Sequence, residues 1–560
     1  MLRSFRHKFA HILTTLSGVA MFLVMSTCLL GQTPTPTPVP NDAPPPVQPS
    51  FVTIPKPTPD PSRVGVNIAD PLPLTLQDAI DMALRNNNNI DVTRNNVRIN
   101  EFNLTAAQGV YDPFINSQTY YESRTTPVAS TIGGAVNGST TQRQLFNDFG
   151  VSGFTPRYGG SYDVIFNQAR TTSTNRNATL NPQFPTNLTA TYTQPLWRGL
   201  RIDLNRRNIM IARKNIDTTE SQLRQQAIES INSVELAYWD LVYYLRLLQV
   251  QNETLTQARE QLESNKRLVE HGVLAPIEVV AAEAQIANFE QLIFGAQENI
   301  TRSENTLKTL LLPDRTSPEW SRPILPTTPS NPEIPRIGVE VATSEALRNR
   351  PEIEQVRTQG EINRIDQRFF KDQTKPQIDL IGSYTASGLA GQPNPNSSGA
   401  ANVPPNLIGG YGSSLGNLLA QDYPTYRVGV QLGLPLRNRT AKANFGRTLV
   451  EAERIENNLA QIEQTVEAEV RNALQALRSA ESRLTSATAA RVAAEELASS
   501  EQRQFRAGTT TFYLVRQRIA DLAVARAVEL RAQTDLNRAV AEFQRSIGTT
   551  LTVNNVTITR

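Results

Sequence analysis

Few residues of this chain have the side chains that catalytic and metal sites use. Cys28 is the only cysteine, and His271 is the only histidine beyond the first eleven residues. A thiol serves as nucleophile, metal ligand or disulfide partner, and an imidazole serves as base or metal ligand. A single thiol cannot form an intrachain disulfide, and one residue of each type cannot form a His/Cys cluster. The sequence also lacks a Ser/His/Asp spacing, a Walker loop and a Rossmann glycine pattern. We therefore predict no enzyme, no catalytic residues, no metal site and no cofactor.

Residues 1–31 are predicted to be a secretory signal peptide. The segment begins with basic residues, continues with an apolar stretch from Leu16 to Leu30, and offers a cleavage site after Gly31. The stretch is short for a transmembrane helix, which needs roughly 20 apolar residues. Two interpretations of Cys28 stay open: it accepts a lipid, as in bacterial lipoproteins, or it is removed with the signal peptide.

The formal charge of +3 comes entirely from this N-terminal segment. Without its Arg3, Arg6 and Lys8, 52 of the 55 basic residues remain, against 52 acidic ones. A nucleic-acid-binding protein normally carries a basic face. The balance of charge therefore disfavours nucleic acid as a partner.

Much of the sequence occurs twice. Residues 83–90 (ALRNNNNI) match residues 346–353 (ALRNRPEI), and further matches pair Leu241 with Leu477 and Gly272 with Gly508. Two long copies imply one architecture with internal pseudo-symmetry. We predict a first repeat over 74–312 and a second over 341–548.

The segments outside the repeats are rich in proline. Residues 32–73 are predicted to be a Pro/Thr-rich tether, because such sequences favour extended polyproline geometry and bury no core. Residues 313–340 are predicted to link the repeats, since their prolines exclude a continuous helix. Residues 549–560 form a C-terminal tail.

Each repeat is predicted to end in a long helical hairpin, over 199–312 and 437–548. The first long helix has no proline for about 70 residues, which would make it on the order of 100 Å long. Apolar residues recur along it every seven positions, the spacing of coiled-coil contacts. Gly272 and Gly508 are predicted to end the long helices at their C-caps. A shorter helix opens the first repeat at Thr75, with a break near Asn86–Asn89.

Between the opening helix and the hairpin, each repeat alternates polar and apolar residues, within 113–194 and 376–436. Tyr162, Val164 and Phe166 alternate with polar residues in the first repeat, as do Tyr426 and Val428 in the second. This period of two predicts strands with one apolar and one polar face. We expect about two usable strands per repeat, four in total, with some extra extended segments between 123 and 186.

Strands of this kind in an exported protein suggest an outer-membrane β-barrel. Its strands need about 9–11 residues, and all of its edges must be paired in lipid. Four strands cannot close a barrel, since the smallest known barrels have eight. We therefore predict an oligomer whose polar strand faces line an aqueous lumen and whose helical hairpins extend that lumen away from the membrane.

A series of short motifs, in this order, resembles the TolC-like outer membrane efflux proteins over about residues 74–548. The motifs open the first repeat, mark the strand-to-helix junction and mark the two hairpin turns. They are Leu74-x-Leu76-x-x-Ala79-Ile80-x-x-Ala83-Leu84, Gln194-Pro195-Leu196-Trp197-Arg198-Gly199, Gly272-Val273-Leu274-Ala275-Pro276-Ile277-Glu278 and Phe505-Arg506-Ala507-Gly508-Thr509-Thr510-Thr511.

The resemblance implies an α+β membrane protein and a homotrimer. Three chains would form a twelve-stranded β-barrel in the outer membrane, continued by a periplasmic coiled-coil barrel of α-helices, with two internal structural repeats per chain. It implies an outer-membrane channel, the exit duct of a tripartite efflux pump or a type I secretion system. Its partners would be outer-membrane lipid, a periplasmic adaptor (membrane fusion) protein and an inner-membrane pump.

By the same resemblance, the two hairpin turns are candidates for the periplasmic gate and for adaptor docking, although they also serve the fold alone as turns. The candidate residues are Gly272, Val273, Leu274, Glu278, Gly508, Thr509, Thr510, Tyr513, Arg516 and Arg518. Family members often carry acidic residues just beyond the second turn, where this chain has Tyr513 and Arg516. We hypothesise that charge at the entrance comes from Glu278 with Arg516 or Arg518, and that cation preference is weaker than in such relatives.

Two alternative functions are a periplasmic coiled-coil adaptor and a structural surface protein. An adaptor would need a lipoyl-like half-motif and β-domain sequence flanking one hairpin, whereas this chain has two hairpins. A structural coiled coil would lack the alternating strands. The duct is therefore the preferred interpretation.

Overall fold

The structure is a computed structural model that describes residues 63–129, 131–135, 137–397 and 399–558. These residues belong to a single compact unit that begins at Ser62. The predicted signal peptide, Cys28 and most of the predicted tether lie outside the described residues.

The first helices begin and end at capping side chains. α1 (Leu76–Asn86) starts after Thr75, whose hydroxyl accepts a hydrogen bond from the N–H of Asp78 at 3.1 Å, while the Asp78 carboxylate accepts one from the N–H of Thr75 at 3.4 Å. This reciprocal pair is a capping box. α2 (Asn88–Gln108) is capped by Asn87, which accepts from the N–H of Asn89 at 2.9 Å. The predicted N-cap at Thr75 and the predicted break are both confirmed.

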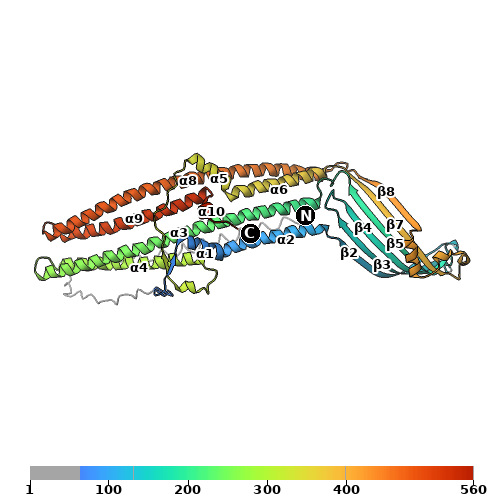
Figure 1. The fold of residues 1–560 in the computed structure, drawn as a ribbon, viewed down its shortest axis with the longest axis horizontal. Coiled ribbons are helices and arrows are strands. Elements are labelled where there is room, and N and C mark those ends of the chain that lie inside the picture. Colours follow the sequence, from blue (N-terminus) through green and yellow to red (C-terminus); the bar gives the residue numbers. More distant parts are fainter. Residues whose placement is uncertain (1–62, 130, 136, 398, 559–560) are drawn as a thin grey trace, which may run out of the picture. The chain divides into compact units, whose positions relative to one another are not determined.

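Two long helical hairpins dominate the fold (Figure 1). The first consists of α3 (Leu204–Glu270) and α4 (Ile277–Leu311), and the second of α8 (Arg439–Arg506) and α9 (Phe512–Ser546). With 67 and 68 residues, α3 and α8 have the lengths that the proline-free runs predict. The helix ends agree with the predicted ends to within a few residues.

The order of elements in the first half recurs in the second. α5 (Val339–Asn349) and α6 (Pro351–Gln373) precede strands β7 and β8 and the second hairpin, as α1 and α2 precede strands and the first hairpin. Pro351 occupies the first position of α6, where a backbone N–H would have no partner within the helix, so proline is tolerated there.

Each half has its own apolar core, built at equivalent places. In the first half, α1, α3 and α4 pack around Ile80, Tyr238 and Leu241, which are fully buried. In the second half, α5, α6, α8 and α9 pack around Ile353, Leu477 and Phe543. Leu241 and Leu477, which the sequence matches pair with one another, are 0% and 1% exposed.

α3 joins the two halves, because it packs against α2, α4, α6 and α9. Arg207 on α3 forms an ion pair with Asp366 on α6, with 2.6 Å between Nε and Oδ1. Asp240 on α3 pairs with Arg538 on α9, also at 2.6 Å.

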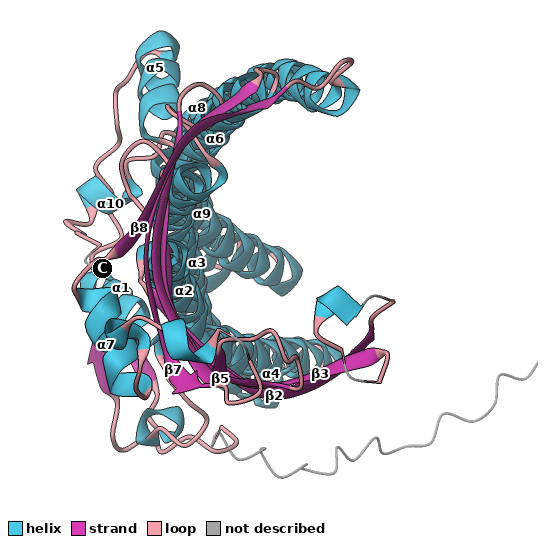
Figure 2. Ribbon diagram, turned by 90° about the vertical axis from the view of Figure 1, so that its right-hand side faces the viewer, coloured by secondary structure: helices cyan, strands magenta, loops and turns pink. Residues whose placement is uncertain are grey.

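Six strands form one antiparallel sheet in the order β2-β3-β4-β5-β7-β8. The strands are β2 (Phe114–Pro127), β3 (Ser139–Phe154), β4 (Ser161–Ser173), β5 (Leu180–Pro195), β7 (Gln377–Pro393) and β8 (Tyr423–Gly433). The sheet is curved when viewed along the helices (Figure 2). Its outermost strands, β2 and β8, each lack a neighbour on one side within the described part of the chain.

The expected count of four strands was wrong. The first half contributes four strands rather than two, because the extra extended segments between 123 and 186 pair along their full length as β3 and β4. In the second half, the segment predicted as strand over 376–436 also contains α7 (Tyr411–Leu419). Alternation was visible in the sequences of β4, β5, β7 and β8, but the pairing of polar segments such as Ser139–Gln144 was not.

Short elements tie the segments outside the repeats to the fold. β1 (Leu72–Leu74) pairs in parallel with β6 (Ile324–Pro326), so part of the predicted linker lies beside the start of the first repeat. α10 (Thr550–Val553) lies within the predicted tail and packs against α3 and α9.

A buried carboxyl group lies where α10 meets α3. Glu235 is 4% exposed, and its Oε1 accepts a hydrogen bond from Nδ2 of Asn554 at 3.2 Å. Its Oε2 has no hydrogen-bond partner among the described residues. Burial disfavours the charged form and raises the pKa of Glu235 from 4.5 to about 7.

Glu235 is therefore expected to make stability depend on pH. Between pH 4.5 and 7 the unfolded chain loses this proton while the folded chain keeps it, so wild-type stability falls as pH rises through this window. Glu235→Gln removes this pH dependence. The free energy of unfolding of the variant should therefore exceed that of the wild type by an amount that grows with pH, to at most about 3 kcal/mol above pH 7. Thermal melts followed by far-UV circular dichroism at pH 4.5 and pH 8 measure it. Glu229→Gln, at an exposed position of the same helix, should show no such divergence.

Candidate functional site

The sheet has one apolar and one polar face, and the strand register shows that these faces are continuous. Residues opposite each other in antiparallel strands point to the same side. One such row is apolar: Ile115, Val151, Val164, Ala190, Tyr384 and Tyr426. The row two residues away adds Phe149, Phe166, Leu188 and Ala386.

The intervening rows are largely polar, although Phe114 and Ile165 also lie in them. One runs through Ser152, Asp163, Thr191, Ser383 and Arg427, and another through Gln118, Asp148, Asn167, Asn187 and Ser387. The predicted alternation is therefore confirmed in β4, β5, β7 and β8, whereas in β2 and β3 it is interrupted, because Phe114, Tyr120 and Phe146 lie on the polar side. A sheet surface of this kind can border water on one side and an apolar medium on the other.

Helix α7 identifies which face lies on the outside of the curve. Gly388 is on the same side of the sheet as the apolar rows, and a Cβ built on it would lie 2.1 Å from the carbonyl oxygen of Ser414 on α7. The hydroxyl of Thr186, on the same side, lies 2.9 Å from that of Ser414. Figure 2 shows α7 on the convex side of the sheet. The apolar face is therefore convex and the polar face is concave.

The two edge strands expose much apolar surface. Val428 and Leu432 on β8 are 81% and 63% exposed, and Phe114 and Tyr121 on β2 are 68% and 65% exposed. An unpaired edge strand offers free N–H and C=O groups to another strand. Both edges of this sheet are therefore open to pairing with further strands.

A buried aspartate fixes the junction between sheet and helices. At Gly199, where β5 leads towards α3, φ is +85°. The N–H of Gly199 donates to Oδ2 of Asp372 at 2.6 Å, and its carbonyl accepts from Nη2 of Arg206 at 2.6 Å. Asp203 caps α3 by accepting from the N–H of Arg206. These bonds set the direction in which α3 leaves the sheet.

The two hairpin turns have the same geometry. Gly272 and Gly508 have φ of +70° and +76°, which is the left-handed conformation that favours glycine. In each turn the next residue bonds back across the helix end: Val273 N–H to Leu268 at 2.9 Å, and Thr509 N–H to Gln504 at 3.0 Å. This is a Schellman-type cap. The two glycines predicted to end the long helices are confirmed, each one residue beyond the C-cap residue, His271 or Ala507.

The remaining candidate residues lie around these turns in different surroundings. Val273 and Tyr513 are exposed, at 71% and 57%, whereas Leu274 is partly buried. Thr510 hydrogen-bonds to the carboxylate of Glu501.

The charges near the turns are held in distinct ways. The guanidinium carbon of Arg516 lies 5.4 Å from the centre of the Tyr513 ring, within cation–π range. Arg518 pairs with Asp521 at 3.3 Å, so its charge is offset locally. Glu278 is in the first turn of α4, where a carboxylate is favoured by the helix dipole.

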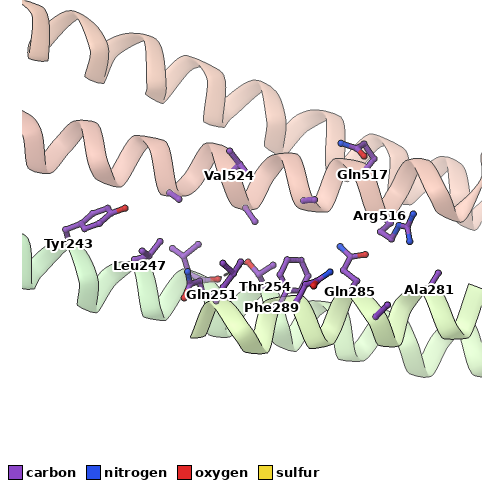
Figure 3. Close-up of a pocket in the computed structure, with 17 residues that line it drawn as sticks. Tyr243, Leu247, Gln251, Thr254, Ala281, Gln285, Phe289, Arg516, Gln517 and Val524 are labelled. Atoms are coloured by element: carbon purple, nitrogen blue, oxygen red, sulfur yellow. Dashed lines mark hydrogen bonds between the residues drawn. The ribbon is translucent and has the colours of Figure 1, made fainter. Parts of the chain in front are cut away.

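A groove of about 620 Å³ separates α3 and α4 from α9 (Figure 3). Its walls include Leu247 and Phe289 on one side and Val524 on the other. Arg516 lies at the groove, which is also bordered by Ala281, one turn beyond Glu278, and by Gln285.

Sequence reasoning did not identify the groove. A signal was present, because Ala520, Ala523 and Ala527 follow helical spacing on α9 and face Ala281 and Ala284 across it. Small side chains on facing helices normally permit close approach, so the alanines alone did not distinguish a groove from tight packing.

The described residues contain no group of three or more His, Cys, Asp or Glu side chains that could hold a metal ion. No helix in the described ranges combines the length and the apolar character needed to cross a membrane.

Comparison with known proteins connects this geometry to one family. The family model for outer membrane efflux protein matches residues 166–311, from β4 to the end of α4. No curated protein matches the chain.

Solved structures with a similar fold include three outer-membrane channels. The channel OprN has a TM-score of 0.59 at 17% identity, covering 85% of this chain and 90% of that chain. CmeC of Campylobacter jejuni has a TM-score of 0.57 at 14% identity, and the match covers 85% of this chain and 86% of that chain. The open state of MtrE of Neisseria gonorrhoeae has a TM-score of 0.55 at 16% identity, and the match covers 85% of this chain and 89% of that chain. Residues 166–311 are therefore similar in sequence to outer membrane efflux proteins, and the chain shares the fold of outer-membrane channels over most of its length.

Proposed function

We propose that the chain is an outer-membrane channel, the passive exit duct of a tripartite efflux pump or a type I secretion system. The observation that carries this proposal is the curved sheet, which is apolar on its convex face, polar on its concave face and open at both edges. Lipid would cover the convex face, and water would fill the concave side. The family is one of channel proteins, and the proposed role requires no catalytic residue.

The open edges support assembly into a closed ring. Because the sheet has an even number of antiparallel strands, β2 and β8 run in opposite directions. β8 of one copy can therefore pair with β2 of the next and continue the antiparallel pattern. Such a head-to-tail interface closes into a ring when the rotation fits. We propose a homotrimer, on the resemblance to TolC-like proteins, with two structural repeats per chain and the hairpins forming a periplasmic tunnel.

The hairpin ends are the proposed docking site for a periplasmic adaptor protein, which would link the duct to an inner-membrane pump. Exposed Val273 and Ile277 at the first turn, with Tyr513 beyond the second, supply an apolar contact surface. The groove between the hairpins provides a second surface of the same character.

Outer-membrane fractionation and planar-bilayer recording test the proposal. The protein should fractionate with the outer membrane, and the purified oligomer should conduct ions. A soluble periplasmic protein without conductance would rule out the duct.

The charge at the entrance leads to a selectivity prediction. Because Glu278 at the first turn is balanced by Arg516 at the second, whereas Arg518 is already paired with Asp521, the wild-type channel should prefer cations only weakly. In a KCl gradient, Glu278→Gln should shift the reversal potential towards anions, and Arg516→Gln should shift it towards cations. Both shifts should shrink at high salt, where charges are screened. Strong cation selectivity that persists in Glu278→Gln would contradict this assignment.

A further inference from the structure

The hairpin β3–β4 is the part of the sheet that no helix continues. β2 follows α2, β5 leads into α3, β7 follows α6 and β8 leads into α8. β3 and β4 are joined instead by the short turn 155–160. The sheet therefore has six strands, while four helices continue it.

This hairpin spans the full height of the sheet. β3 pairs with β2 from Phe114 opposite Ser152 to Pro127 opposite Ser139. At the helical end, the carbonyl of Tyr158 accepts a hydrogen bond from Nε2 of Gln194 at 2.8 Å. Gly159 lies so close to the start of α3 that an added Cβ would be 2.8 Å from Oδ2 of Asp203. The turn therefore sits at the junction of sheet and helices.

In the half of the sheet nearer the helices, several residues of the two strands continue the faces of their neighbours. Phe149 and Val164 lie in the apolar convex rows and are 49% and 37% exposed. Asp148 and Asp163 lie in the polar concave rows. If the β3–β4 hairpin lay outside the wall of a barrel, its faces would not have to match those of β2 and β5.

We propose that β3 and β4 are additional wall strands that widen the exit. The inference rests on the proposed function: three copies that close edge to edge would form a barrel of eighteen strands, three times six, instead of twelve. Barrel diameter grows roughly linearly with strand number, so the cross-section would be about 2-fold larger. Barrels of about 16–18 strands enclose an aqueous channel. The barrel would then pass cargo larger than a twelve-stranded wall admits, and the size limit would lie in the helical part.

Deleting residues 128–179 tests the proposal, because it joins β2 directly to β5. Ile115 and Ala190 already lie in the same apolar row, so the shortened sheet can pair without turning either strand over. The matched control replaces the β4–β5 loop, 174–179, with six Gly and Ser residues, which keeps all six strands.

Electron cryomicroscopy of the wild-type oligomer counts the wall strands without any variant. Eighteen strands are expected, and a wall of twelve with β3–β4 outside it would overturn the inference. In planar bilayers, polyethylene glycols added to the barrel side report the cross-section. The deletion should reduce it about 2-fold and the control should not; equal values for deletion and wild type would also overturn the inference. A wild-type protein that forms no ring and no conductance would instead overturn the proposed function.

Discussion

Replacing Val428 with arginine is expected to remove most of the assembled protein from the outer membrane. Val428 is 81% exposed and lies opposite Gly382 in the apolar convex rows of the sheet. If this face contacts lipid, an arginine there costs roughly 2–4 kcal/mol near the middle of the bilayer. The cost would apply to each copy in the ring. The amount of assembled oligomer in outer-membrane fractions measures the effect.

Gln431→Arg is the matched control, since it adds the same side chain to the same strand on the opposite face. Gln431 is exposed and lies in the polar rows, where the neighbouring Arg427 already carries a guanidinium. We expect Gln431→Arg to assemble normally and to change only ion selectivity. Normal assembly of Val428→Arg, or equal loss in both variants, would mean that the convex face does not meet lipid.

The helical part of this fold was predictable because its signals are local. The proline-free run that becomes α3, the cap at Thr75 and the C-cap at Gly272 each depend on residues within a few turns of one another. Leu241 and Leu255 lie two heptads apart on α3 and are 0% and 8% exposed, as the seven-residue spacing of apolar residues predicts.

The number of strands was not predictable in the same way. β3 begins with a run of polar residues, Ser139–Gln144, whose pairing with β2 and β4 depends on contacts far along the chain. α7 was missed because its nine residues lie in a Gly- and Ser-rich connection, and its packing relies on Gly388 and Thr186 of the distant sheet.

The sequence predicted the two hairpin turns, but it did not predict how the hairpins lie against each other. The turns at Gly272 and Gly508 were located to the residue, since a left-handed glycine marks each. The groove between the hairpins depends on how α9 lies against α3 and α4, which the one-dimensional pattern of alanines does not specify.

Removing the charge of Glu304 is expected to have the largest effect on the stability of the helical part. Its side chain is 2% exposed and neutralises two cations: Oε1 is 2.7 Å from Nζ of Lys308, and Oε2 is 2.7 Å from Nη1 of Arg63. Lys308 also donates to the carbonyl of Trp320 at 2.8 Å. These bonds hold the start of the described chain and the segment between the halves against α4.

Glu304→Gln leaves the Lys308 ammonium, itself 2% exposed, without a counter-charge, and breaking a buried pair in this way costs about 3–5 kcal/mol. Lys308→Met should cost less, because Arg63 still neutralises Glu304. Glu298→Gln is the control on the same helix: its pair with Arg302 is 73%/71% exposed and contributes at most about 1 kcal/mol. Denaturant unfolding followed by the helical circular dichroism signal should therefore rank the losses Glu304→Gln, Lys308→Met, Glu298→Gln. If Glu304→Gln and Glu298→Gln unfold at the same denaturant concentration, the buried charges do not stabilise the contacts of α4 with the segments around Arg63 and Trp320.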